Sequence, residues 1–188
     1  DRARKIDARN PRLLWVSAAA RLSWAHTLHQ HGRDGDPLRD EAARDLEASL
    51  ALDPHDADAW RASALVHHGR GLAAAARGQD PLPHYAHAVE DFAAALRERA
   101  GFADALRGRA IARLNWGNWV RQGGQEPVEH YRQAVEDLTE ALRLNPADFF
   151  AWQTRGKVRT EWASQAIGSR TGEAEALFVE ADRDLSRA

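Results

Sequence analysis

Cysteine and methionine are both absent from this chain of 188 residues. Without cysteine the chain can form no disulfide, no thiolate metal site and no cysteine nucleophile. The lack of methionine, even at position 1, leads us to expect a piece of a longer protein. No apolar run approaches the roughly 20 residues that span a bilayer, and no secretory signal opens the chain. We therefore expect a cytoplasmic protein with no membrane partner, although a chain without cysteine suits either side of a membrane.

An excess of charge of one sign is also lacking. The 26 basic and 28 acidic side chains give a formal net charge of −2. This balance leaves no general electrostatic footprint for nucleic acid or for an anionic membrane. Arginine and tryptophan are plentiful, as in proteins that bind single strands, but the acids are interleaved with the arginines. The tryptophans also recur at a fixed spacing, which favours a role in the core, and we expect no nucleic-acid partner.

The sequence repeats itself at an offset of 46 residues. The stretch at 89–96, VEDFAAAL, returns at 135–142 as VEDLTEAL, and His84-Tyr85 returns as His130-Tyr131. Trp60 and Trp152 stand two such steps apart, with an apolar residue at the step between them. Several unrelated positions agree on one offset, so the sequence predicts a repeat protein.

Each copy has the pattern of two helices. In the third copy residues 102–121 contain no proline, and Gly123-Gly124 then breaks the chain. Apolar residues recur at steps of three and four from 127 to 144, which indicates an amphipathic helix that Asn145-Pro146 ends. β-branched residues are sparse and nothing alternates with period two. We predict an all-α chain whose copies span 12–55, 56–101, 102–147 and 148–188, after the tail of an upstream helix at 1–10.

The second helix of each copy carries a characteristic series: alanine, a large apolar residue four positions later, a small residue three after that, and then proline. The series is Ala42, Leu46, Ser49 and Pro54 in the first copy and Ala134, Leu138, Ala141 and Pro146 in the third. A tryptophan, Trp60 or Trp152, stands six residues after each proline. These residues resemble the tetratricopeptide repeat family, whose period is about 34 residues. The excess here falls between the two helices of each copy.

The resemblance implies an α-α superhelix, a solenoid of about four antiparallel helix pairs, whose concave face binds a protein or peptide. A column of tryptophans lies on the lengthened part of the first helices: Trp24, Trp116 and Trp162. We expect this column to pack near Tyr85, Tyr131 and Phe178, at the start of the second helices.

The concave face of such a solenoid is lined by its first helices. The residues expected there are Asp58, Arg61, Leu65, His68, Asp104, Arg107, Ile111, Asn115, Gln153 and Lys157. Arg61, Arg107 and Lys157 would form a mildly cationic track with apolar anchors, which suits an extended acidic or mixed peptide. Family members that bind chaperone tails use asparagine in a carboxylate clamp. Leu65 and Ile111 stand at that position here, so we expect no recognition of a C-terminal carboxylate.

Arginines occupy positions of the first helices at which the family usually has apolar or aromatic residues. Arg109 and Arg113 lie four apart, and Arg155 and Arg159 repeat them in the next copy. They could bind an anion or an acidic peptide, because a guanidinium matches carboxylate and phosphate geometry. A buried unpaired guanidinium is very costly, however, and aspartates recur in register with them. We therefore favour internal pairing with Asp91, Asp137 and Asp184.

Metal binding and catalysis find little support. His26 and His29 lie three apart with His31 near, but no acidic residue flanks them at ligand spacing, and the adjacent His67 and His68 point apart. Motifs for phosphate binding, dinucleotide binding, zinc proteolysis, nucleophile elbows and kinases are missing. We expect no catalytic residues, no metal and no cofactor.

The sequence predicts a non-catalytic scaffold that binds a protein or peptide. Two alternatives stay open: a regulatory or sensory arm of a multidomain enzyme such as a protein kinase, and a structural spacer or self-assembling array. The fourth copy stops within its second helix, so we expect exposed apolar surface near Leu177, Val179 and Leu185 and possible end-to-end self-association.

Overall fold

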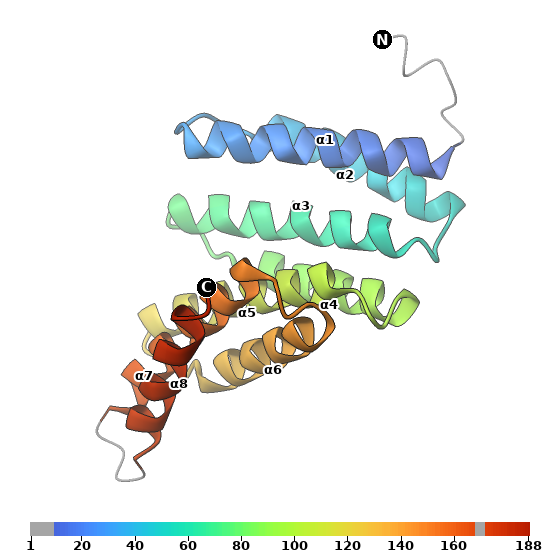
Figure 1. The fold of residues 1–188 in the computed structure, drawn as a ribbon. Coiled ribbons are helices and arrows are strands. Elements are labelled where there is room, and N and C mark those ends of the chain that lie inside the picture. Colours follow the sequence, from blue (N-terminus) through green and yellow to red (C-terminus); the bar gives the residue numbers. More distant parts are fainter. Residues whose placement is uncertain (1–9, 168–171) are drawn as a thin grey trace. The chain divides into compact units, whose positions relative to one another are not determined.

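The computed structural model describes residues 10–167 and 172–188, and within them the chain forms eight α-helices and no strand (Figure 1). The helices are α1 (Pro11–Gln30), α2 (Asp36–Leu52), α3 (Ala57–Ala76), α4 (Leu82–Glu98), α5 (Ala103–Gln122), α6 (Val128–Leu144), α7 (Phe149–Ala166) and α8 (Glu173–Leu185). They form four antiparallel pairs, which confirms the all-α solenoid class predicted from the sequence. The upstream tail expected at 1–10 lies outside the described residues except for Asn10.

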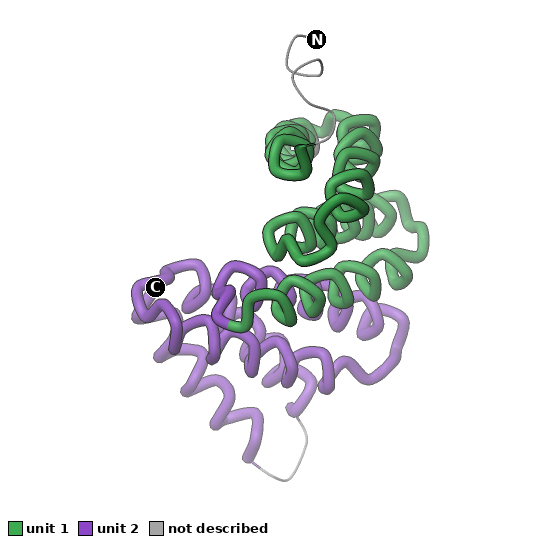
Figure 2. The backbone as a smooth tube through the Cα atoms, turned by 90° about the vertical axis from the view of Figure 1, so that its right-hand side faces the viewer, with its two compact units in different colours: residues 1–100 green, residues 101–188 purple. Residues whose placement is uncertain are grey.

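The chain divides into two compact units, residues 1–100 (unit 1) and residues 101–188 (unit 2) (Figure 2). Unit 1 contains α1–α4 and unit 2 contains α5–α8. In unit 1 the second helix of one pair, α2, packs against the first helix of the next, α3. In unit 2, α6 packs against α7 in the same way. Each unit is therefore two stacked helix pairs.

Glycines with positive φ follow the first helix of three pairs. Gly32, Gly78 and Gly124 have φ of 67°, 70° and 74°. After Gly124, the backbone N–H of Gln125 donates to the carbonyl of Val120 at 2.9 Å, which satisfies a carbonyl at the end of α5. Glycine adopts this left-handed conformation without a Cβ penalty, so the sequence ends its long first helices at these points.

Unit 1 has a core built largely from alanine. Ala18 of α1, Ala42 and Leu46 of α2, and Ala62 and Val66 of α3 are all nearly or fully buried in one cluster. Small side chains at the contact let helices approach closely, because a large core residue on one helix can fill the space that alanine leaves on the next. The alanine and leucine of the family-like series in α2 are two of these residues.

Unit 2 has a core with larger residues. Leu114 of α5, Tyr131 and Leu138 of α6, and Val158 of α7 are buried together, and Trp162 packs against them. The apolar stripe that the sequence shows along 127–144 is the face of α6 turned towards this core. Burial of this stripe, rather than intrinsic helix propensity, provides most of the stability of such a helix.

The tyrosine at the start of the second helix lies over a glycine of the first helix in two pairs. A Cβ added to Gly71 would lie 2.5 Å from Cε1 of Tyr85, and one added to Gly117 would lie 2.7 Å from Cε1 of Tyr131. Both tyrosine side chains are buried as a result. These glycines are required for close approach of a ring.

Of the tryptophan column, Trp116 packs as expected and Trp24 of α1 does not. The ring of Trp116 stacks on His130, next to Tyr131, with centroids 4.7 Å apart. Trp24, by contrast, is 59% exposed. One repeat step before Tyr85 the chain has Arg39, so α2 offers no aromatic side chain at the position where Tyr85 and Tyr131 stand in the next two pairs.

The expected apolar surface on α8 is only partly present. Val179 and Leu185 are exposed, but Leu177 is buried, contrary to the expectation from the sequence. Leu177, Ala181 and Asp184 recur at steps of four and three and form the buried face of the helix. None of the helices in the described residues is long and apolar enough to cross a membrane.

Candidate functional site

The arginines in unusual positions pair with aspartates of the second helices, as predicted. Arg109 of α5 donates two hydrogen bonds to Asp137 of α6, from Nε at 2.9 Å and from Nη2 at 2.6 Å. Arg113, one turn later, also donates to Asp137. The aspartate is 5% exposed, and the three groups together satisfy one another away from water.

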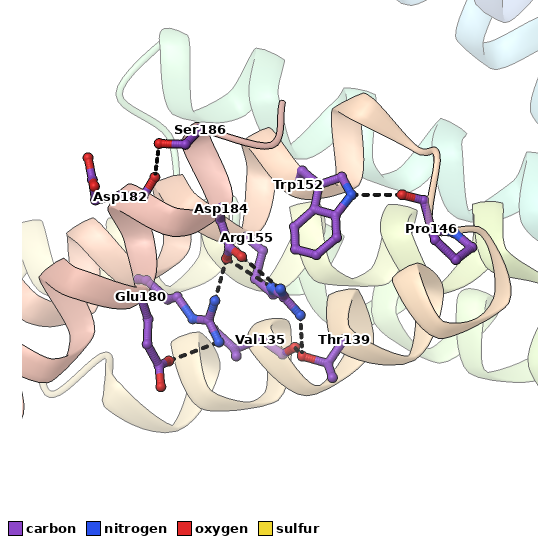
Figure 3. A network of polar contacts seen from close by, with 10 residues as sticks. Val135, Thr139, Pro146, Trp152, Arg155, Glu180, Asp182, Asp184 and Ser186 are labelled. Atoms are coloured by element: carbon purple, nitrogen blue, oxygen red, sulfur yellow. Dashed lines mark hydrogen bonds and ion pairs between the residues drawn. The ribbon is translucent and has the colours of Figure 1, made fainter.

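The same arrangement recurs between α7 and α8 (Figure 3). Arg155 donates to Asp184 at 2.9 and 2.7 Å and also to the hydroxyl of Thr139 on α6 at 3.0 Å. Arg159 donates to the same aspartate and forms an ion pair with Glu180 at 2.9 Å. The arginine of the fourth pair therefore also bonds to the third pair through Thr139, within unit 2.

Unit 1 contains two variants of this arrangement. In the first pair Arg21 bonds to Asp45 and to Glu41. In the second pair Asp91 accepts a hydrogen bond from the hydroxyl of Ser63 at 2.6 Å, and no arginine among the described residues forms an ion pair with it. The expected arginine partner of Asp91 is thus wrong, because Ser63 and His67 occupy the two arginine positions.

These ion pairs join helices of the same unit, and their role is structural. Each guanidinium described above is bonded to a carboxylate of its own unit, so its charge is already compensated within the chain. Ser63, His67 and Asp91 lie close together but do not form a nucleophilic triad. The serine hydroxyl is bonded to the carboxylate rather than to the imidazole, which therefore cannot take its proton.

Four of the predicted groove residues come together in unit 2. Ile111 and Asn115 of α5 and Gln153 and Lys157 of α7 line one open pocket of about 600 Å³. The remaining lining residues are Leu114, Thr154, Thr160, Glu161 and Leu185. The pocket combines aliphatic side chains with amide, hydroxyl and ammonium groups and with the carboxylate of Glu161, which pairs with Arg121. Lys157 forms no ion pair with any described residue, and its ammonium group is exposed.

The other two predicted groove residues of unit 2, Asp104 and Arg107, bond to each other, and Arg107 also contacts residues at the start of α7. Arg107 donates to Asp104 at 2.7 Å, and its Nε lies 3.5 Å from a carboxylate oxygen of Asp148. Its guanidinium also lies over the ring of Phe150, 5.9 Å from the centroid. Two carboxylates thus compensate the charge of Arg107, and Lys157 is the cation that the pocket presents.

The four predicted groove residues of unit 1 all lie on α3. Asp58 accepts a hydrogen bond from Arg99 at 2.7 Å, Arg61 is half-buried, and Leu65 is exposed. Burial lowers the pKa of His68 to about 4, with a smaller contribution from His26, so this imidazole is neutral at pH 7.

The histidines weighed as metal ligands lie apart from any site of that kind. His26 contacts the side chain of Gln30 at 2.9 Å, and the side chain of His29 is outside the described part. Among the residues that the structure describes, no three histidine, aspartate or glutamate side chains are placed to hold a metal ion. The structure brings together two other histidines, His67 of α3 and His87 of α4, whose ring centroids are 5.1 Å apart. Sequence spacing could not reveal this contact, since the rings come from different helices.

Four antiparallel pairs with internal arginine–aspartate bonds define an all-α helical repeat protein of the solenoid class. Two crystal structures of MamA resemble it. One is 16% identical with a TM-score of 0.57 and covers 98% of this chain and 74% of MamA. The other is 18% identical with a TM-score of 0.56 and covers 99% and 84%. At such identities the likeness shows the fold alone. No protein-family model matches the sequence, and neither does any curated protein.

Proposed function

We propose that this chain is a non-catalytic, protein-binding scaffold made of enlarged tetratricopeptide-like repeats of 46 residues. The first helices of the last three pairs begin at Ala57, Ala103 and Phe149, 46 residues apart, which supports a unit of that length. The fold shared with MamA, a tetratricopeptide-like repeat protein, supports the same class. Stacked pairs of this kind present their first helices as a binding surface.

The pocket of unit 2 carries the functional part of the proposal. Its aliphatic residues Ile111, Leu114 and Leu185 offer a place for one apolar side chain, and Asn115 and Gln153 offer amide groups for a peptide backbone. Lys157 adds a positive charge that forms no ion pair with a described carboxylate, while the carboxylate that lines the pocket, that of Glu161, pairs with Arg121 at 3.2 Å. A partner segment with an apolar residue next to an acidic one fits this arrangement, because apolar burial holds the segment and charge orients it.

Peptide binding to purified full-length chain tests this proposal. An array of peptides that pair one large apolar residue with acidic neighbours would be screened, and the best binder measured by fluorescence anisotropy. Lys157→Glu should weaken that binder about tenfold, since an attractive charge becomes repulsive. Leu185→Ala should weaken it as well by removing apolar contact.

Arg143→Glu is the matched control. Arg143 is an exposed cation of α6 that pairs with Glu140 and does not line the pocket. Its reversal changes the net charge by the same amount as Lys157→Glu and should leave binding within a factor of two. Equal effects of the two reversals would show that the chain attracts acidic peptides only through its overall charge.

End-to-end self-association is a second candidate, which exposed apolar residues favour. Leu13 and Val16 of α1 and Val179 and Leu185 of α8 are all exposed. Two copies of the chain could cover such surfaces by continuing the stack of helix pairs. Sedimentation over a hundredfold range of concentration tests this, and Val179→Glu should reduce any association. A monomer throughout that range contradicts it.

A further inference from the structure

Four histidines gather where α3 meets α4 in unit 1. His67 and His68 lie in the middle of α3, and His84 and His87 lie one turn apart at the start of α4. We call these four residues the histidine cluster. The rings of His67 and His87 are 5.1 Å apart between centroids, and His68 lies 6.2 Å from the ring of Tyr85. The charge state of this contact therefore depends on pH in a way that aliphatic packing does not.

His67 stands in a position that arginine occupies in the other three pairs. Arg21, Arg113 and Arg159 are related to it by steps of 46 residues, and each donates to the aspartate of its own second helix. His67 Nε2 lies 3.9 Å from Asp91, too far for a hydrogen bond. Guanidinium groups stay charged across the accessible pH range, whereas imidazole does not. At this repeat position the second pair thus has a titratable imidazole where the other three pairs have a guanidinium.

The surroundings of His67 favour the neutral ring. Its Nδ1 is buried and has no hydrogen-bond partner among the described residues. A proton on this atom would create a buried donor with nothing to accept it, which costs more than leaving an acceptor lone pair unused. Protonation in the packed state is therefore opposed by geometry.

Nearby charges act in the same direction. Arg70, on α3, bonds to Asp40 of α2 at 2.6 Å and still repels a charge on His67, as do His84 and His87 of α4. The carboxylate of Asp91 on α4, by contrast, favours a positive charge on His67. Other facing groups are His26 of α1, which repels a charge on His68, and Asp36 of α2 and Asp80, which favour a charge on His84. Burial, followed by these repulsions, lowers the pKa of His67 to about 4.

We propose that the α3–α4 pair is an acid-sensitive element of unit 1, in which protonation of His67 and His68 loosens the packing of α3 on α4 while the arginine–aspartate pairs of the other helix pairs hold. An unfolded histidine binds its proton near pH 6.5, whereas His67 and His68 in the packed pair resist it down to about pH 4. The opened state binds more protons between these values. The stability of the pair is therefore full above pH 6.5 and is lost as the pH falls towards 4.

Hydrogen exchange of the full chain at pH 7.5 and pH 5.0 tests the proposal. After correction for intrinsic exchange, the protection of amides in α3 and α4 should be lower at pH 5.0 than at pH 7.5. His67 and His68 should each contribute a factor of about 30 to this fall. Helices α7 and α8 contain no histidine and should keep their protection. The variant His67→Gln/His68→Gln should lose the pH response of α3 and α4, because glutamine stays neutral. His55→Gln, at an exposed histidine paired with Glu98, should respond as the unmodified chain does.

Two outcomes would overturn the proposal: an equal fall in protection in α3–α4 and α7–α8, or a full pH response in the double variant. If the double variant does not fold at pH 7.5, His87→Gln gives an independent answer. Its side chain is exposed, so the change is mild, and it removes a neighbour that repels a charge on His67. The loss of protection in α3 and α4 should then be several-fold smaller, and an unchanged loss contradicts the proposal.

Discussion

Arg155 donates two hydrogen bonds to Asp184, at 2.9 and 2.7 Å, and both side chains lie among the most buried polar groups of unit 2. Removing two charges from water is costly, and the bidentate geometry offsets much of that cost. The pair therefore need not add much net stability. Its importance is that either partner left alone would be an uncompensated buried charge. The same reasoning applies to Asp137, which accepts hydrogen bonds from both Arg109 and Arg113.

Asp137→Ala should be strongly destabilising. The change leaves Arg109 and Arg113 without their shared carboxylate, and we expect a loss of about 3–5 kcal/mol in the free energy of unfolding. Glu140→Ala removes an exposed partner of Arg143 and should cost far less, because water and salt screen an ion pair on the surface. Urea unfolding of both variants at pH 7 measures the difference. Equal midpoints would show that the buried pairs are no more important than surface ones.

Gly117→Ala should destabilise unit 2 through a steric clash. The new methyl group would lie 2.7 Å from Cε1 of Tyr131, a ring that is fully buried, and we expect a loss of about 1–3 kcal/mol. Gly101→Ala, whose methyl would have its nearest neighbour 3.9 Å away, is the control and should change stability by less than about 0.5 kcal/mol. Thermal unfolding followed by circular dichroism tests both. A Gly117→Ala variant as stable as the parent would mean that the ring moves aside freely.

Alkaline pH should destabilise unit 1 through Tyr85. Burial raises the pKa of this phenol from 10.0 to about 12. The unfolded chain then loses its proton first, so stability is full below pH 10 and declines between pH 10 and 12. At pH 11 the decline attributable to Tyr85 is about 1.4 kcal/mol. Urea titrations of the parent chain and Tyr85→Phe at pH 8 and 11 isolate it, and identical pH dependences would exclude this role.

Asp148→Ala should weaken the start of α7. Its carboxylate accepts a hydrogen bond from the backbone N–H of Ala151 at 3.0 Å and lies 3.5 Å from Arg107. Loss of a helix cap of this kind costs about 1–2 kcal/mol. Asp148→Asn keeps the cap but removes the charge, and should fall between alanine and the parent. Unfolding by guanidinium measures the stability of both variants. If Asp148→Asn lost as much stability as Asp148→Ala, the ion pair with Arg107, rather than the helix cap, would be the main contribution of Asp148 to stability.

Much of the fold follows from local features of the sequence. The helix predicted at 102–121 is observed as Ala103–Gln122, and the one at 127–144 as Val128–Leu144. Helix-breaking glycine and proline and a stripe of period 3.6 act over a few residues, so they can be recognised without knowing the tertiary structure. The bond between Arg109 and Asp137 was also predictable, because a buried guanidinium demands a carboxylate and the repeat brings one into register.

The groove could be predicted from the sequence only in part. Spacing along α5 and α7 put Ile111, Asn115, Gln153 and Lys157 on one surface, and these four do line one pocket. Spacing did not indicate that Leu185 would join them or that Asp148 would lie near Arg107. Both depend on where a side chain of one helix ends relative to another helix, which is a matter of packing.

The sequence by itself determined the helices, their pairing and the aspartates that bond to Arg109 and Arg155, because these depend on periodicity and on the cost of burying charge. Only the tertiary structure decided that Trp24 is exposed, that Asp91 bonds to Ser63, and that His67 meets His87. Position along a helix tells which face a residue occupies, but not which residue of another helix lies opposite. That is settled by the volumes of all the side chains at the contact, which must fill the space together.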